Sequence, residues 1–193
     1  MCGRYYVDEI TEKEIRKVIA AADHQMKLKT GDIHPSDRAV VITGKQHIMT
    51  AEQMVWGFPQ YQKKGIMINA RAENVFDRVT FRDSMRCRRC VVPAGGFYEW
   101  NRNKEKASFQ RTDTPVLYMA GLFQQFEDGP RFVILTTRAN PSVASVHDRM
   151  PLILEEDELE KWIYDNSYAE FLLKKMPVLL KRHQEYEQQR LPF

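Results

Sequence analysis

The residue that follows the initiator methionine, Cys2, offers the most unusual chemistry in this sequence. Removal of Met1 would leave a free α-amine and a thiol on one residue. A peptide α-amine has a pKa of about 8, so an appreciable fraction is neutral and nucleophilic near pH 7. The amine can form a Schiff base with an aldehyde, and the thiol can then close onto the imine as a five-membered thiazolidine. On position alone, a small buried residue near a terminus is the simpler interpretation of Cys2.

A second group of polar residues lies in "MINARAEN" at 67–74. Asn69, Arg71 and Glu73 alternate along the chain, so on a strand they would share one face. Asn69 could then donate hydrogen bonds, and Arg71 could bind a phosphate with its guanidinium fork. A solvent-exposed strand face would produce the same alternation.

A carboxylate stands among aromatic residues in "VVPAGGFYEW" at 91–100. Desolvation by Phe97, Tyr98 and Trp100 would raise the pKa of Glu99 and suit it to general acid–base catalysis. The alternative is an exposed glutamate on a hairpin.

A histidine occupies the predicted loop before a strand in "ANPSVASVHDRMPLIL". His147 is a candidate acid–base group or oxyanion donor, and Arg149 could reach a phosphate from two residues further on. A surface or capping histidine is the alternative.

The other two cysteines form a C-x-x-C pair, Cys87 and Cys90. A zinc site needs two more ligands, and the sequence has neither a second such pair nor the usual histidine spacing. We therefore expect no metal and no cofactor, and we expect Cys90 to be buried at the start of a strand.

The bulk properties are those of an ordinary globular protein. The 193 residues suit one domain, and the net charge of +3 permits a polyanionic partner without requiring one. The first residues lack an apolar signal region, and the longest apolar run, 115–123, is too short to span a bilayer. With an odd number of cysteines, these features predict an intracellular, cytoplasmic monomer with reduced thiols.

The patterns predict an α+β fold, with a mainly antiparallel sheet and helices outside it. A helix is expected from Thr11, with a capping box to Glu14 and a staple between Ile10 and Ile15. Its apolar stripe continues through Val18, Ile19 and Ala22.

Strands and two late helices complete the prediction. A hairpin over 39–58 is expected to turn at Gly44 and Lys45, and further strands are expected within 91–137. One late helix covers 157–165, and the other begins at Ser167 with a capping box to Glu170.

Five motifs occur in order: "MCGRY", "NARAE", "RRCVVPAGGFYEW", "ILTTRAN" and "HDRMP". Together they resemble the SRAP family, the SOS response-associated peptidases, over most of residues 1–155. The resemblance implies one compact domain over residues 1–193, with a barrel-like, mainly antiparallel β structure. It leaves the tail 177–193 undefined, because the chain beyond Trp162 lacks the family's usual valine–asparagine segment. Two smaller departures are "AGLF" in place of "AGLW" and "AGG" in place of "ADG".

Members of this family crosslink to abasic sites in single-stranded DNA through a thiazolidine on the N-terminal cysteine, and thereby protect the lesion. The resemblance implies four catalytic residues, which are Cys2, Asn69, Glu99 and His147. It implies phosphate contacts from three arginines and places a proline near a DNA-bending wedge. We also expect one tryptophan to stack on bases. These DNA-binding residues are Arg4, Pro35, Trp56, Arg71 and Arg149.

The implied reaction uses Glu99 and His147 to move protons at O4′ and C1′ as the sugar opens. The Cys2 amine then attacks C1′ and the thiol closes the ring, while Asn69 supplies orientation. The same groups would reverse the crosslink, and a stalled imine would permit β-elimination, an AP-lyase side activity.

Two other functions fit the same residues. A cysteine peptidase, or an autopeptidase that removes Met1, would use Cys2 as nucleophile and His147 as base. A non-covalent single-stranded DNA-binding module would need no turnover at all.

Overall fold

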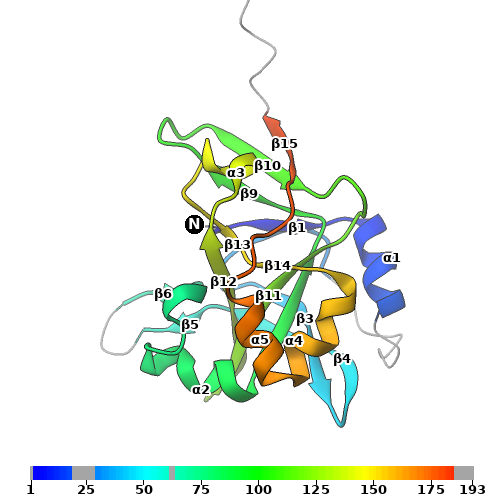
Figure 1. Ribbon diagram of the computed structural model, residues 1–193, viewed down its shortest axis with the longest axis vertical. Helices are drawn as coiled ribbons and strands as arrows, with labels where there is room; N and C mark the ends of the chain where they lie inside the picture. The colour runs from blue at the N-terminus through cyan, green and yellow to red at the C-terminus, as the bar shows by residue number, and fades with distance from the viewer. Residues whose placement is uncertain (1, 19–28, 61–63, 185–193) are drawn as a thin grey trace, which may run out of the picture.

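The computed structural model describes residues 2–18, 29–60 and 64–184 (Figure 1). A five-stranded antiparallel sheet has the order β15-β10-β9-β1-β2. An eight-stranded sheet has the order β13-β12-β4-β3-β8-β11-β14, with β7 beside β12, and β5 and β6 form a small third sheet. The strands are β1 (Tyr5–Val7), β2 (Gly31–Ile33), β3 (Arg38–Lys45), β4 (Ile48–Trp56), β5 (Phe58–Pro59), β6 (Ile66–Met67), β7 (Asn69–Arg71), β8 (Arg89–Ala94), β9 (Gly96–Trp100), β10 (Lys106–Gln110), β11 (Leu117–Phe126), β12 (Gly129–Arg138), β13 (Arg149–Pro151), β14 (Ile153–Leu154) and β15 (Lys181–Gln184).

The larger sheet closes into a barrel. Strand β11 pairs with both β8 and β12, while β12 also pairs with β4, so β12, β4, β3, β8 and β11 form a ring. Closure gives each of these strands two neighbours and removes exposed edges. The pairings of β12 with β4 and with β7 are parallel, and the other pairings of this sheet are antiparallel. The predicted mainly antiparallel, barrel-like fold is confirmed.

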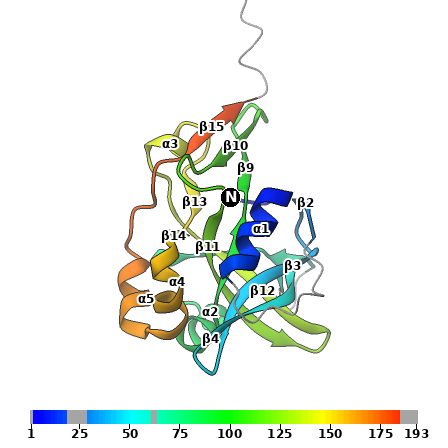
Figure 2. The ribbon, with the colours of Figure 1, turned by 90° about the vertical axis from the view of Figure 1, so that its right-hand side faces the viewer.

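The helices lie outside the sheets. In both views α2, α4 and α5 gather at one end of the molecule, and α3 and β15 lie at the other (Figures 1 and 2). Within the described ranges, no helix is long and apolar enough to span a bilayer. The helices are α1 (Glu9–Val18), α2 (Val79–Cys87), α3 (Pro141–Ala144), α4 (Leu159–Tyr164) and α5 (Asn166–Leu172), with 3-10 turns η1 (Ala72–Asn74) and η2 (Glu156–Glu158).

Aromatic side chains join the two main sheets. The buried ring of Trp56, at the end of β4, lies 5.2 Å from Tyr5 of β1 and 6.2 Å from Phe132 of β12. Strand β8 is buried along its whole length, and its Cys90 is completely buried as predicted. The Cys90 carbonyl accepts a hydrogen bond from Trp162 Nε1 at 2.9 Å, so α4 packs directly on the barrel.

The first helix begins earlier than predicted. Asp8 Oδ1 accepts hydrogen bonds from both Thr11 N and Thr11 Oγ1, each at 2.7 Å, so Asp8 caps the helix and Thr11 lies within it. The charged carboxylate also complements the positive end of the helix. The predicted staple is wrong because Ile10 is 61% exposed. Ile19 and Ala22 lie outside the described residues.

The hairpin turn was predicted two residues too early. Gln46 and His47 form the turn, both with positive φ, and Lys45 pairs with Ile48. Gly44 belongs to strand β3. A Cβ at Gly44 would lie 2.3 Å from Tyr164 Cε1, so this glycine allows α4 to pack closely against β3.

The C-terminal part is tied to the fold as far as Gln184. The helix predicted from Ser167 begins at Asn166 instead, because Asp165 Oδ1 accepts a hydrogen bond from Tyr168 N at 3.0 Å. Residues 181–184 then form β15 against β10. The rest of the tail lies outside the described residues.

Candidate functional site

The Cys2 side chain is completely buried just before β1. Its Sγ lies 3.8 Å from the carbonyl oxygen of Arg4, to which the thiol can donate. Burial raises the pKa of the Cys2 thiol, and the negative charge of Glu99 raises it further. The thiol is therefore protonated at neutral pH.

Asn69 holds the backbone of Cys2. It opens β7, where pairing with Ile134 of the long strand β12 fixes its position. Its Nδ2 donates to the Cys2 carbonyl oxygen at 2.9 Å. Its Oδ1 is buried and accepts no hydrogen bond from the part of the chain that the structure describes. The amide thus fixes Cys2 with one atom and keeps an acceptor available with the other.

Glu99 points into the molecule from β9. Phe97 and Glu99 alternate inward on this strand, and Glu99 is 2% exposed, whereas Tyr98 and Trp100 face outward. Burial raises the pKa of Glu99, and the opposing effect of His147 is weaker. The predicted desolvated carboxylate is present, and its charge interacts with both Cys2 and His147.

His147 follows α3 and is a quarter exposed. Its Nδ1 accepts a hydrogen bond from Arg149 N at 3.0 Å and also lies 3.0 Å from Asp148 Oδ1. A neutral ring can use the first contact, which leaves the proton on Nε2, and a protonated ring can donate in the second. Both protonation states therefore have a partner.

An open pocket of about 740 Å³ lies beside His147. Two loops line it, residues 100–103 after β9 and residues 144–148 before β13. Trp100 and His147 both line this space, which is large enough for part of a nucleotide.

Arg149 is engaged by a carboxylate. Its Nη1 and Nη2 contact the two carboxylate oxygens of Glu73 at 2.5 and 2.8 Å, and Nη2 also donates to Thr136 O at 2.6 Å. These hydrogen bonds lower the pKa of Glu73. A phosphate at Arg149 would have to replace Glu73.

The two other predicted arginines differ in their surroundings. Arg4 lies over the Trp100 ring at 5.2 Å and 3.6 Å from Asp32, at the edge of the site. Arg71 is exposed, two residues after Asn69 on β7. Both side chains reach solvent, as phosphate contacts require.

Trp56 does not fit its predicted stacking role. It is completely buried, and its Nε1 donates to Ile68 O at 3.0 Å, so neither ring face can meet a base. It supports the residue before Asn69 instead. Pro35 is half-buried in the neighbouring turn, where Ser36 N donates to Trp56 O at 2.8 Å.

Tyr5 belongs to the site but was not predicted. Its hydroxyl is buried and has no hydrogen-bond partner among residues 2–18, 29–60 and 64–184. Burial raises the pKa of Tyr5, which stands three residues after Cys2 and packs against Trp56. Strand alternation from Val7 would have placed Tyr5 inside, but no sequence motif marks its hydroxyl as functional.

The C-x-x-C pair is split by the fold. Cys87 ends α2 and is exposed, while Cys90 is buried in β8. Within the described ranges, no group of three His, Cys, Asp or Glu side chains is placed to hold a metal ion.

The family model for SRAP, described as SOS response associated peptidase, matches residues 1–189. The chain belongs to the SRAP family. Similar proteins include the abasic site processing protein YoqW of Bacillus subtilis, 29% identical over 90% of this chain and 87% of the relative. The Escherichia coli abasic site processing protein YedK is 22% identical over 84% of this chain and 79% of its own.

Solved structures share the fold of this SRAP protein. A Bacteroides thetaiotaomicron protein has a TM-score of 0.79 at 22% identity, covering 95% of this chain and 91% of its own. A Bordetella bronchiseptica protein has a TM-score of 0.79 at 21% identity, covering 95% and 99%.

Proposed function

We propose that this SRAP protein processes abasic sites in single-stranded DNA by forming a thiazolidine on Cys2. The observation that carries the proposal is the fixed Cys2 backbone, held by Asn69 beside an acceptor oxygen without a donor. Relatives named abasic site processing proteins supply the substrate class. The open deoxyribose of such a site presents the aldehyde that an N-terminal cysteine requires.

The first stage exposes the aldehyde and forms the imine. An imidazolium at His147, with Nδ1–H held by Asp148, can donate its Nε2 proton to O4′, while the Glu99 carboxylate removes the C1′ hydroxyl proton. After removal of Met1, the Cys2 amine donates to Asn69 Oδ1 and directs its lone pair at C1′. The N–C1′ bond forms as the C=O double bond becomes single, and one amine proton passes to that oxygen, which gives a carbinolamine. Glu99, now protonated, gives its proton to the carbinolamine hydroxyl, which leaves as water, and an iminium ion remains.

The second stage closes the ring. The Cys2 thiol gives its proton to the Glu99 carboxylate, and the sulfur attacks C1′ of the iminium ion. One C–S bond forms, the C=N double bond becomes single, and one water has been lost overall. Burial raises the pKa of Glu99, which makes its protonated form easier to reach, so the group can serve as acid and base in turn.

The geometry supports the amine as first nucleophile over a peptidase thiolate. A cysteine peptidase needs a lowered thiol pKa and a base in hydrogen-bond contact with the sulfur. Here burial raises the pKa of Cys2, and the sulfur contacts the Arg4 carbonyl. A neutral amine is a nucleophile without a lowered thiol pKa and without a base on the sulfur.

Non-covalent binding of the DNA would come from three arginines. Arg4 lies two residues after Cys2 and Arg71 two residues after Asn69, and with Arg149 they would contact phosphates on either side of the lesion. For Arg149 this means exchanging the Glu73 carboxylate for a phosphate group of the backbone. That group has the same charge and also presents two oxygens to the guanidinium fork. Such contacts are independent of base sequence.

The proposal is tested with single-stranded DNA that carries one abasic site. We expect the wild type to give a heat-stable adduct on a denaturing gel, and Cys2→Ala to give none. Cys87→Ala is the matched control, because Cys87 is an exposed cysteine remote in sequence from the site, and it should react like the wild type. DNA with a tetrahydrofuran analogue lacks the aldehyde and should not react. A heat-stable adduct with Cys2→Ala would overturn the proposal.

A further inference from the structure

The chain from Lys175 to Gln184, here called the C-terminal strap, crosses the outside of the molecule from α5 to the five-stranded sheet (Figure 1). It passes α3, the short helix that leads to His147. Several hydrogen bonds connect the strap to α3 and to the residue that caps it.

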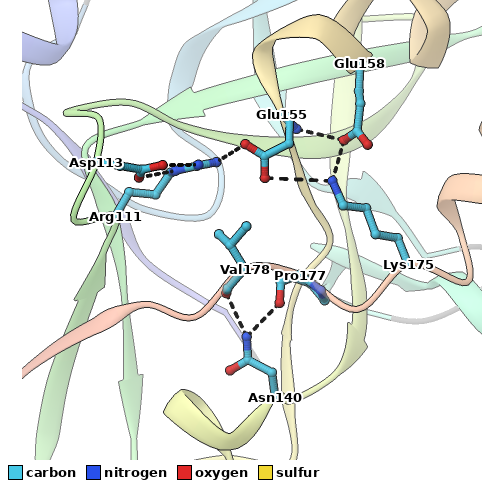
Figure 3. Close-up of polar contacts among 8 residues, drawn as sticks. All are labelled: Arg111, Asp113, Asn140, Glu155, Glu158, Lys175, Pro177 and Val178. Atoms are coloured by element: carbon cyan, nitrogen blue, oxygen red, sulfur yellow. Dashed lines mark hydrogen bonds and ion pairs between the residues drawn. The ribbon is translucent and has the colours of Figure 1, made fainter.

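Asn140 joins the strap to α3 (Figure 3). Its Oδ1 caps the helix by accepting from Ser142 N at 3.0 Å. Its Nδ2 donates to two strap carbonyls, Pro177 O at 3.0 Å and Val178 O at 2.7 Å. Asn140 is 1% exposed, and its bond to Pro177 O is buried, whereas those to Val178 O and Ser142 N are partly buried. Both ends of one buried amide are used.

Two further bonds continue this connection. Leu180 N donates to Ser142 Oγ at 3.1 Å, and Arg182 Nη1 donates to Ser145 Oγ at 3.2 Å. The strap then pairs with β10 at Ala107, which pairs on its other side with Glu99. The strap therefore spans from the helix before His147 to the strand beside Glu99.

The other end of the strap is held by charge (Figure 3). Lys175 Nζ lies 2.6 Å from Glu158 and 3.8 Å from Glu155. Glu155 in turn pairs with Arg111 at 2.7 Å, and Arg111 pairs with Asp113 at 2.6 Å. The strap is thus anchored on both sides of Asn140.

The backbone of α3 transmits this constraint to His147. His147 N donates to Val143 O at 3.1 Å, and Val146 N donates to the same oxygen at 2.8 Å. Val143 is completely buried and cannot shift without moving the core. His147 therefore stands on a turn whose start is fixed by Asn140.

We propose that the strap positions the His147 loop and that Asn140 is the positioning residue through which it does so. The effect on catalysis rests on the proposed function, whereas the effect on the loop does not.

Asn140→Asp separates the two uses of the amide. The aspartate keeps an oxygen to cap α3 but loses both donors to the strap, and its charge faces two carbonyl oxygens. Ser142→Ala is a milder second variant, which removes the acceptor of Leu180 N. Asp165→Asn is the matched control, because it alters the cap of α5, a helix that does not lead to His147.

The first measurement uses the free protein and amide hydrogen exchange. Asn140→Asp should speed exchange in residues 142–149 by roughly tenfold or more, through the loss of two hydrogen bonds. Ser142→Ala should speed it less, and Asp165→Asn should leave it unchanged. Unchanged exchange in both Asn140→Asp and Ser142→Ala would overturn the proposal, and this result needs no DNA.

The second measurement is a double-mutant cycle on the rate of adduct formation. Asn140→Asp should slow the wild type by roughly tenfold, yet add nothing in a His147→Ala background, because its effect passes through His147. An equal slowing in both backgrounds would show that the strap acts elsewhere and would overturn the proposal. If the wild type forms no adduct, the proposed function fails and the exchange result alone decides the role of the strap.

Discussion

Asn69 Nδ2 donates a 2.9 Å hydrogen bond to the carbonyl oxygen of Cys2, and this bond links strand β7 of the barrel to the start of β1 in the other sheet. The reactive terminus is thereby fixed by a residue 67 positions away in the chain. A free chain end would lose conformational entropy each time it reacts. Because this bond already fixes the backbone of Cys2, the nucleophile is preorganised.

Loss of this bond should slow the reaction without abolishing it. We expect Asn69→Ala to lower the single-turnover rate of adduct formation by about 100-fold, because misplacement of the reacting group costs rates of that order. Asn69→Asp keeps an acceptor for the amine but loses the donor, so its rate should fall between the rates of the wild type and Asn69→Ala. Wild-type rates in Asn69→Ala would remove the orienting role.

The raised pKa of Glu99 predicts how stability changes with pH. A group with a raised pKa in the folded state stabilises the fold at low pH, and that contribution is lost as pH rises through the folded pKa. Glu99→Gln does not ionise and does not incur this loss. The melting temperature of the variant relative to the wild type should therefore increase as pH rises from about 4.3, the ordinary glutamate pKa, towards neutrality. A difference that stays constant with pH would contradict burial of an ionisable Glu99.

The Glu73–Arg149 pair predicts a gain in DNA binding. Glu73→Gln removes a charge that competes with phosphate, while Thr136 O still holds Arg149 at 2.6 Å. We expect a few-fold tighter binding to unmodified single-stranded DNA, measured by fluorescence anisotropy at several salt concentrations. Arg149→Ala should weaken binding and reduce the salt slope by about 0.7, the value for one contact to a single strand. Weaker binding in Glu73→Gln would show instead that Glu73 is needed to orient Arg149.

Gly95 explains one departure from the family pattern. A Cβ at this position would lie 2.7 Å from Tyr6 Cε2 and 2.8 Å from Thr11 Oγ1. Restoring the family's common residue with Gly95→Asp should therefore destabilise this protein by about 1–3 kcal/mol, as overpacking does. Gly95→Ala should show most of the effect in a denaturant titration, since the Cβ is its cause. An unchanged denaturation midpoint in Gly95→Ala would contradict this explanation of the glycine.

Some local features could be predicted from the sequence, since each depends on residues near in the chain, although the helix starts and the hairpin turn were displaced by one or two residues. Burial of Cys90 followed from its place at the start of an apolar strand. Burial of Glu99 was also expected, but two of the three aromatic neighbours named for it, Tyr98 and Trp100, face outward on β9. The predicted place of His147, in a loop just before a strand, also matched, because β13 begins at Arg149. The motifs that carried the family resemblance supplied Cys2 and Asn69 as candidates, and their catalytic roles stay predictions.

Other features depend on partners that a local pattern does not show. Barrel closure needs β4 to meet β12, which joins Trp56 to Phe132 across the chain. The burial of Trp56 follows from that closure, so the stacking role was wrong. Helix α2 was missed because its apolar residues, Phe81 and Met85, are few and face the barrel. The strap's use of Asn140 depends likewise on a segment 37 residues away.

The measurement that tests the central claim most directly is intact mass spectrometry after reaction with single-stranded DNA bearing one abasic site. The adduct should have the mass of the protein without Met1 plus the DNA minus one water. Denaturation and alkylation with iodoacetamide then distinguish the bond, because the chain has three cysteines. A thiazolidine consumes the Cys2 thiol, so the adduct should accept two alkyl groups and the unreacted protein three. An adduct that accepts three groups, or no adduct with the aldehyde present, would contradict thiazolidine formation at Cys2.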